Sequence, residues 1–183
     1  MNARLSTDLP VTLAESAALR LDRAAPTGRL SLRARGDLSA LNAALGIALP
    51  TRIGATARGA IEAACLGPDE WLILAPLAEV ARLQAACAAV YPDHPHSLVD
   101  ISGREVGFTL RGPRAAEALT LGCPRDIDSV APGTARRTLF DGATVTLWRD
   151  GPDRFRMDVW NSFAPHVLHL LKTGCRELAA EIA

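Results

Sequence analysis

The sequence contains few aromatic residues and almost no lysine. Aromatic side chains make up 4% of the 183 residues, and Lys172 is the only lysine. No block of Lys or Arg occurs, and the formal net charge is zero. Because nucleic-acid-binding proteins usually carry a basic patch or stripe, we expect no nucleic-acid partner.

Long apolar runs are also missing. The longest fall far short of the ~20 residues that span a bilayer, and the N-terminus lacks the continuous apolar core of a signal peptide. The cysteines Cys65, Cys87, Cys123 and Cys175 are scattered, with no CxxC pair. In a chain without an export signal they indicate reduced thiols, three of them buried. We therefore expect a cytoplasmic protein with no membrane partner.

Three motif classes are absent. There is no GxGxxG after a strand, no P-loop lysine and no HExxH. We therefore predict that the chain has no catalytic residue, no cofactor-binding residue and no metal ligand of its own.

Two landmarks repeat in the same order along the chain. Residues 30–37 are matched by residues 108–113, and the Gly67-Pro68-Asp69 turn is matched by Gly151-Pro152-Asp153. A repeat of this kind indicates two copies of one supersecondary unit.

Hydrophobic periodicity predicts the elements of each copy. In the first copy we expect a strand at 30–33, a helix from Asp37 to Gly46, strands at 60–66 and 71–74, and a helix over 77–90. In the second we expect a strand at 106–110, a helix at 113–121, a hairpin around Asp141-Gly142, a strand ending at Val159, and a last helix capped by Ser162. The order β-α-β-β-α therefore occurs twice, with an extra strand in the second copy. This predicts an α+β fold of antiparallel sheets with helices on one face.

The domain organisation is predicted from the Pro- and Gly-containing segments that interrupt regular secondary structure. Residues 1–26 form an N-terminal extension with one short helix near Leu13 to Leu21. Residues 27–183 form a single duplicated domain, with a first repeat of about 27–91 and a second of about 97–183.

The histidines offer weak candidate sites. His94 and His96 have a spacing that can ligate a metal, but no third ligand stands at a recognisable spacing, so two linker histidines are the favoured interpretation. His166 lies on the apolar stripe of the last helix with His169 three residues on, which favours a packed imidazole over a catalytic one.

Cys123 and the Asp100 turn are two further candidates. No group next to Cys123 in sequence except Arg125 would lower its pKa, so a buried structural thiol is favoured. Asp100, Ser102 and Arg104 are expected to form a turn that either binds a polar ligand or ties the chain by Asx-type hydrogen bonds. The structural interpretation is favoured.

Large aromatic side chains are the candidate interface anchors in this aromatic-poor chain. Aromatic residues, Trp especially, are enriched among interface hot spots. We predict that Trp71, Trp148 and Trp160, and also Phe163, are interface anchors. Burial of these side chains in the core is the alternative.

A series of short motifs resembles the gamma subunit of heterotetrameric sarcosine oxidase. The resemblance covers about residues 60–180 and rests on Leu66–Leu72, His96–Ser102 with Arg104, Gly122-Cys123-Pro124, Asp126, Gly133, Arg137-Thr138 and Ser162-Phe163-Ala164.

This resemblance implies a non-catalytic accessory subunit whose partners are the alpha, beta and delta subunits. Such enzymes oxidise sarcosine to glycine, reduce oxygen to peroxide and pass the methyl carbon to tetrahydrofolate. In that family FAD, FMN, NAD and zinc are held by the partner subunits, and gamma carries none.

The family also resembles the folate-binding domain of the glycine-cleavage aminomethyltransferases, which implies the same fold. Those enzymes place carboxylates on the strand after a glycine turn, and residues 142–147 contain none. Folate chemistry by general acid–base catalysis is therefore not expected here. The alternative function is a free-standing folate-binding or aminomethyltransferase-like protein.

Overall fold

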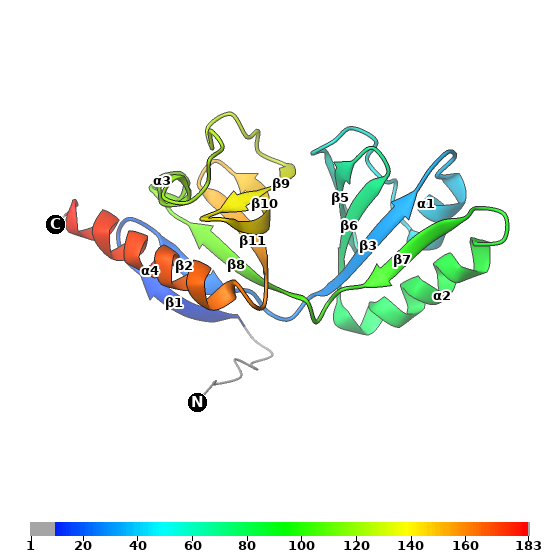
Figure 1. The fold of residues 1–183 in the computed structure, drawn as a ribbon, viewed down its shortest axis with the longest axis horizontal. Helices are drawn as coiled ribbons and strands as arrows, with labels where there is room; N and C mark the ends of the chain where they lie inside the picture. The colour runs from blue at the N-terminus through cyan, green and yellow to red at the C-terminus, as the bar shows by residue number, and fades with distance from the viewer. Residues whose placement is uncertain (1–9, 183) are drawn as a thin grey trace. The chain divides into compact units, whose positions relative to one another are not determined.

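The computed structural model describes residues 10–182, which contain two antiparallel sheets and four α-helices. The chain divides into two units, each built on one sheet (Figure 1). One unit comprises residues 27–104 and 133–136, and the other comprises residues 10–26, 105–132 and 137–182. The predicted α+β class with antiparallel sheets is confirmed.

The first unit contains a five-stranded sheet in the order β4-β5-β6-β3-β7. Its strands are β3 (Gly28–Ala34), β4 (Thr56–Arg58), β5 (Glu62–Gly67), β6 (Glu70–Ala75) and β7 (His96–Asp100). Helix α1 (Ser39–Leu45), the 3-10 turn η1 (Leu77–Glu79) and helix α2 (Val80–Val90) complete the unit. Alternate strand residues such as Leu30, Leu32, Trp71 and Ile73 share one core with Leu83 of α2. The helices therefore cover one face of the sheet.

The second unit contains a six-stranded sheet in the order β1-β2-β8-β11-β10-β9. The strands of this sheet are β1 (Val11–Glu15), β2 (Arg20–Arg23), β8 (Glu105–Arg111), β9 (Thr134–Phe140), β10 (Ala143–Gly151) and β11 (Arg154–Trp160). The first three residues of β9, 134–136, are grouped with the first unit. Helices α3 (Ala115–Thr120) and α4 (Ala164–Ala180) bury Leu119, Val167 and Leu171 against Phe108 and Phe155. This core again lies on one face of its sheet.

The two sheets repeat one arrangement. The order β3-α1-β4-β5-β6-α2 of the first copy recurs as β8-α3-β9-β10-β11-α4, and equivalent strands occupy equivalent places in the two sheets. The expected duplication is confirmed. The strand expected as an extra in the second copy, β9, has a counterpart in the first copy, the three-residue strand β4. The short Thr56-Ala57-Arg58 segment has no apolar alternation, so periodicity did not reveal it.

Each sheet takes one strand from the segment that precedes the other copy. Strand β7 directly precedes β8 in the chain, but it pairs with β3. Strand β2 directly precedes β3, but it pairs with β8. The two copies therefore exchange their leading strands.

The helix expected near Leu13 to Leu21 is wrong, because β1 and β2 form an antiparallel pair there. Ser16 makes the turn between them, and its Oγ accepts hydrogen bonds from the backbone N–H groups of Ala18 and Leu19 at 3.2 and 3.4 Å. Leu19 and Leu21 point into the core while Arg20 lies on the other face. The local period is therefore two rather than 3.6.

The expected hairpin at Asp141-Gly142 is confirmed. Both turn residues have positive φ, 45° and 79°, which is the conformation of the tight turns that join neighbouring antiparallel strands. This turn fixes the register of β9 against β10.

The start of α4 differs from expectation. The helix begins at Ala164, and no side chain caps it, so the predicted cap by Ser162 is wrong. Val167 and Leu171 are buried, but His166, which was expected on the apolar stripe, is exposed, as is Phe163. Within residues 10–182, no helix combines the length and the apolar character needed to cross a membrane.

Candidate functional site

The Asp100 turn is held by hydrogen bonds within the chain. The backbone N–H and the hydroxyl of Ser102 both donate to Oδ1 of Asp100, at 2.8 and 2.6 Å. These two bonds favour the ionised carboxylate, so they hold the pKa of Asp100 below its ordinary value. Arg104 closes the turn, because its backbone N–H donates to the carbonyl of Ile101 at 2.9 Å.

The same turn ties β7 to β3. Ser102 Oγ accepts the backbone N–H of Arg29 at 2.9 Å, and the backbone N–H of Ile101 donates to the Arg29 carbonyl at 2.8 Å. These contacts give the turn the structural role that the sequence favours. A ligand at Asp100, Ser102 and Arg104 stays a prediction.

Replacing Ser102 tests that structural role. We expect Ser102→Ala to lower the free energy of unfolding by about 1–2 kcal/mol, because the backbone N–H of the buried Arg29 loses its acceptor. Urea unfolding followed by circular dichroism measures the change. Ser102→Thr keeps the hydroxyl and is the matched control. If Ser102→Ala and the wild type are equally stable, the hydrogen bond from Arg29 to Ser102 does not help to hold β7 against β3.

Two of the three predicted tryptophan anchors are core residues. Trp71 is 3% exposed and Trp148 is fully buried. The indole N–H of Trp71 donates to the Pro50 carbonyl at 2.7 Å, and that of Trp148 donates to Asp158 Oδ2 at 3.0 Å. Their rings and N–H groups are therefore engaged within the chain, and the prediction that they anchor a partner is wrong.

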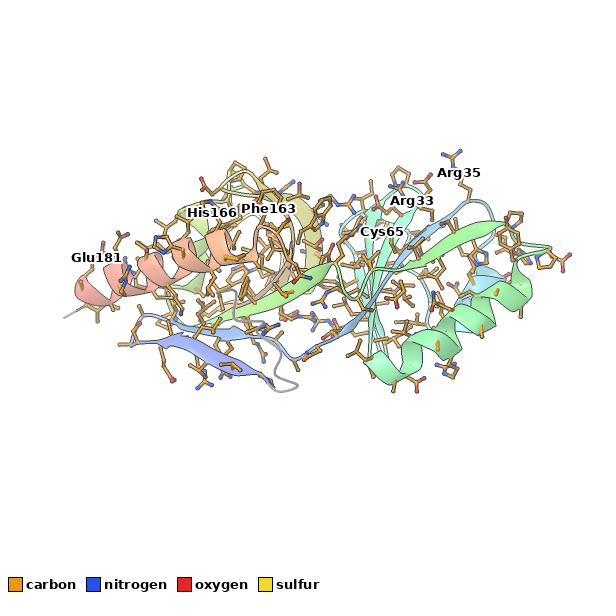
Figure 2. All side chains as sticks on the ribbon, turned by 60° about the horizontal axis from the view of Figure 1, so that its bottom comes forward. Arg33, Arg35, Cys65, Phe163, His166 and Glu181 are labelled. Carbon is orange, nitrogen blue, oxygen red and sulfur yellow. The ribbon has the colours of Figure 1, made fainter. Side chains whose placement is uncertain are left out.

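Trp160 is different, because it lies at the surface. Trp160 and Phe163 are each 44% exposed, and they flank the short turn in which the Phe163 N–H donates to the Trp160 carbonyl at 2.9 Å. Figure 2 shows Phe163 close to His166 at the start of α4. Trp160 therefore remains the one tryptophan of the predicted three that can meet a partner, and its role as an anchor stays a prediction.

The histidines make contacts of their own. The His96 ring nitrogen Nδ1 lies 2.7 Å from the carbonyl oxygen of His94. Nε2 of His166 lies 2.6 Å from Asp141 Oδ2, which makes an exposed pair rather than the packed imidazole expected from the sequence. Among the described residues, no group of three or more His, Cys, Asp and Glu side chains is placed to hold a metal ion.

All four cysteines are buried thiols, where the sequence predicted three. Burial raises the pKa of Cys65, Cys87 and Cys175. Cys123 lies with its sulfur 3.8 Å from the Thr138 hydroxyl. A raised pKa keeps a thiol protonated at neutral pH, so thiolate chemistry is not supported at Cys65, Cys87 or Cys175.

A hollow of about 150 Å³ opens beside Trp71 in the first unit, and it is lined by Ala34, Arg35, Gly36, Leu38, Thr51, Pro68 and Trp71. Ligand pockets usually enclose about 300–1,000 Å³. Arg35 at its rim already pairs with Asp69 at 3.0 Å. This hollow by itself therefore gives no support to the folate-binding alternative.

Strand β10, which contains the residues compared with the aminomethyltransferases, extends further than expected. It runs to Gly151 and so includes Asp150. The Asp150 carboxylate receives two hydrogen bonds from the Arg156 guanidinium, at 2.7 and 3.0 Å. The one carboxylate on this strand is thus part of an ion pair on the sheet.

Comparisons with known proteins agree with the resemblance seen in the motifs. A model of the sarcosine oxidase, gamma subunit family matches residues 34–177. A sarcosine oxidase subunit gamma from Corynebacterium sp. (strain P-1) is 35% identical over 151 residues, which are 80% of this chain and 73% of that protein.

Solved structures show the same relationship. A chain of the heterotetrameric sarcosine oxidase from Corynebacterium sp. U-96, in complex with pyrrole 2-carboxylate, superposes with a TM-score of 0.80 at 31% identity, and the match covers 92% of this chain and 89% of that one. The glycine cleavage system aminomethyltransferase T from Bartonella henselae matches with a TM-score of 0.66 at 14% identity, over 85% of this chain and 46% of that one, which shows a shared fold alone. This chain belongs to the sarcosine oxidase gamma subunit family.

Proposed function

We propose that this chain is the gamma subunit of a heterotetrameric, flavin-dependent sarcosine oxidase, and that it is an accessory subunit without an active site of its own. The observation that carries the proposal is the structural match over 92% of the chain to one chain of the heterotetrameric sarcosine oxidase. The partners are then the alpha, beta and delta subunits. The assembly converts sarcosine to glycine and forms peroxide and methylene-tetrahydrofolate.

The polar side chains that were considered as candidate site residues support an accessory role. Asp100 is bonded to Ser102, His166 to Asp141, and Asp150 to Arg156. Each of these groups joins two parts of the backbone, which is a structural use of a polar side chain. We propose further, from the family resemblance, that the partner subunits hold FAD, FMN, NAD and zinc, and that the complex lies in the cytoplasm.

Purification from the native host tests this proposal. A tagged copy of the chain is expressed in the host grown on sarcosine, and the recovered proteins are weighed by mass spectrometry while the visible spectrum is recorded. We expect three further chains at equal stoichiometry, with the absorption of bound flavin. The host carrying the tag alone is the control.

Recovery of a colourless single chain would contradict the proposal. The free-standing folate-binding protein would then become the leading candidate, and titration with tetrahydrofolate would test it. Its present support is the shared fold with aminomethyltransferase T, which does not determine function.

A further inference from the structure

Three arginines lie side by side on the face of the six-stranded sheet opposite the helices. In the antiparallel register, Arg111 of β8 is paired with Arg20 of β2 on one side and with Arg154 of β11 on the other. The neighbouring residues Leu110 and Phe155 enter the core, so all three arginines belong to the outer face. Side chains that are directly opposite in a sheet are about 4.5–5.5 Å apart at Cβ. We call Arg20, Arg111 and Arg154 the arginine row.

The arginine row has fewer carboxylates beside it than guanidinium groups. Asp22 serves two of the arginines, at 2.8 Å from Arg20 and 3.4 Å from Arg111, and Glu15 lies 3.3 Å from Arg20. Arg154 is exposed, and within residues 10–182 it forms no ion pair. Like charges directly opposite each other destabilise a sheet. The pairing of Arg111 with Arg154 is therefore unfavourable in the chain alone.

The first copy shows the same position with a carboxylate in place. Arg33 of β3 is the counterpart of Arg111, and it is paired with Glu70 of β6, the counterpart of Arg154 after the Gly-Pro-Asp turn. The Arg33 guanidinium lies 3.0 Å from the Glu70 carboxylate and 2.9 Å from that of Asp69. The second copy therefore keeps the arginine but has a second cation where the first copy has a carboxylate.

The side chains of Glu70 and Arg154 also occupy equivalent places in space. Each lies over the glycine that begins its turn. A Cβ placed on Gly67 would be 3.6 Å from a carboxylate oxygen of Glu70, and a Cβ placed on Gly151 would be 4.0 Å from Nε of Arg154. The exchange of charge between the two copies thus happens at one structural position.

Asp153 does not replace the missing carboxylate. It is the counterpart of Asp69, which pairs with Arg33 in the first copy. Asp153 is exposed, and in the part of the chain that the structure describes it forms no ion pair. The donors of Arg154 are therefore available to a carboxylate from outside the chain.

We propose that the arginine row is the docking site for an Asp or Glu side chain of another subunit of the oxidase, bound by Arg111 and Arg154. The inference rests on the proposed function and deepens it by naming one contact through which the chain joins the complex. The guanidinium group matches a carboxylate with two parallel N–H bonds, and Arg33 already binds carboxylates at the equivalent place. A second copy of this chain fits less well, since a twofold contact through this surface would bring two arginine rows together.

Reversing one charge tests the proposal in the full complex. Arg154→Glu, made in the tagged chain, gives the second copy the residue type of Glu70, so Arg111 gains a partner within the chain and an outside carboxylate is repelled. We expect the amount of partner subunits recovered at a fixed dilution to fall by on the order of tenfold or more. Arg125→Glu is the matched control, because Arg125 is exposed in the same unit and forms no ion pair among the described residues.

The variant itself should remain folded. Arg154 is exposed, and the first copy shows that Arg and Glu fit side by side at this position. We expect the melting temperature of isolated Arg154→Glu to equal or exceed that of the wild type, because a like-charge pair is removed. Arg154→Gln, which removes the charge without reversing it, should give a smaller loss of partner subunits.

Crosslinking identifies the occupant. Lys172 is the only lysine of the chain, so Arg154→Lys places a new amine in the arginine row. A carbodiimide activates carboxyl groups, which then form an amide with a neighbouring lysine. In the purified complex we expect mass spectrometry to find position 154 joined to an Asp or Glu of another subunit. Arg125→Lys is the control and should give no such product.

Each outcome supports or overturns the inference. If the wild type and Arg154→Glu recover the partner subunits equally, or if position 154 is joined only to its own chain or to a second copy, the docking site is wrong while the proposed function stands. If the wild type recovers no partner, the proposed function fails and the inference fails with it. If citrate raises the melting temperature of the isolated wild type but not that of Arg154→Glu, while partner recovery is unchanged, the ligand is a free anion and the proposal is overturned.

Discussion

Arg149→Met is expected to lower the free energy of unfolding by about 3 kcal/mol. The Arg149 guanidinium donates to the carbonyls of Ile127, Val130 and Pro152 at 2.9, 2.8 and 3.1 Å, and further bonds reach Asp128 and Gly151 at 3.4 and 3.3 Å. Its charge also lies over the Phe155 ring, 5.3 Å from the centroid. Methionine keeps most of the apolar stem but leaves the part-buried carbonyls of Ile127 and Val130 without this donor, and each unsatisfied buried group costs about 1–3 kcal/mol.

The loop that precedes β9 should respond first. The Arg149 side chain ties residues 127–130 to β10, so in Arg149→Met a protease should cut the loop faster than in the wild type. Thermal unfolding should show a decrease in Tm of roughly 6–12 °C, from about 2–4 °C per kcal/mol in a chain of this size.

Arg154→Met is the matched control for this prediction. Arg154 lies on the neighbouring strand and is exposed, so its loss should change stability by less than about 0.5 kcal/mol. If the two variants unfold at the same temperature, the hydrogen bonds of Arg149 do not hold the loop and the interpretation is wrong.

Gly112→Ala is expected to cost roughly 2–4 kcal/mol. Gly112 has φ of +136°, a conformation that is strained for any residue with a Cβ. A Cβ at this position would lie 2.8 Å from both the carbonyl oxygen of Ala18 and the Cα of Leu19, which are backbone atoms and cannot rotate away. Strain and overpacking therefore act together.

The damage should centre on the N-terminal strand pair. Ala18 and Leu19 form the turn region between β1 and β2, and the Ala18 carbonyl also accepts the backbone N–H of Arg114 at 3.1 Å. Amide hydrogen exchange measured by mass spectrometry should show faster exchange in residues 11–23 of the variant. Gly103→Ala is the control, because a Cβ there meets no atom within 4 Å. Unchanged protection of residues 11–23 in Gly112→Ala would contradict the expected clash.

Local signals in the sequence were sufficient for most elements. The Asp141-Gly142 dipeptide and the spacing of Val80, Leu83 and Cys87 report on neighbours a few residues away, and the hairpin and α2 followed from them. The helix expected near Leu13 to Leu21 was wrong because two short strands, residues 11–15 and 20–23, lie on either side of Ser16. In that segment the alternation of Leu19, Arg20 and Leu21 was the better guide.

The tryptophans show what periodicity leaves undetermined. Trp148 and Trp160 both stand on the face opposite the helices, as their places in β10 and β11 indicate. Trp148 is fully buried, with the Arg156 guanidinium 4.8 Å from its ring centroid and its N–H donated to Asp158, whereas Trp160 is 44% exposed. Alternation along a strand predicts the sheet face on which a side chain lies. It does not predict whether that side chain is buried, because the residues that bury it are not identified by the local pattern.

Long-range pairing was likewise beyond the reach of local patterns. Nothing near Arg149 in the sequence indicates that its guanidinium meets carbonyls about twenty residues earlier. The pairing of β2 with β8 joins residues that are more than eighty positions apart. Such contacts depend on the tertiary fold rather than on residue propensity.

The exchange of leading strands has a consequence for how the chain folds during synthesis. Residues 20–23 leave the ribosome early, but the strand with which they pair, β8, follows only after the whole five-stranded sheet has been made. Each sheet therefore depends on contacts of large sequence separation, which slow folding and lengthen the time during which apolar strands stay exposed. Cutting the gene between the two copies would separate β2 and β7 from their partners, so two half-length proteins should not fold separately and would have to be made together to recover the fold.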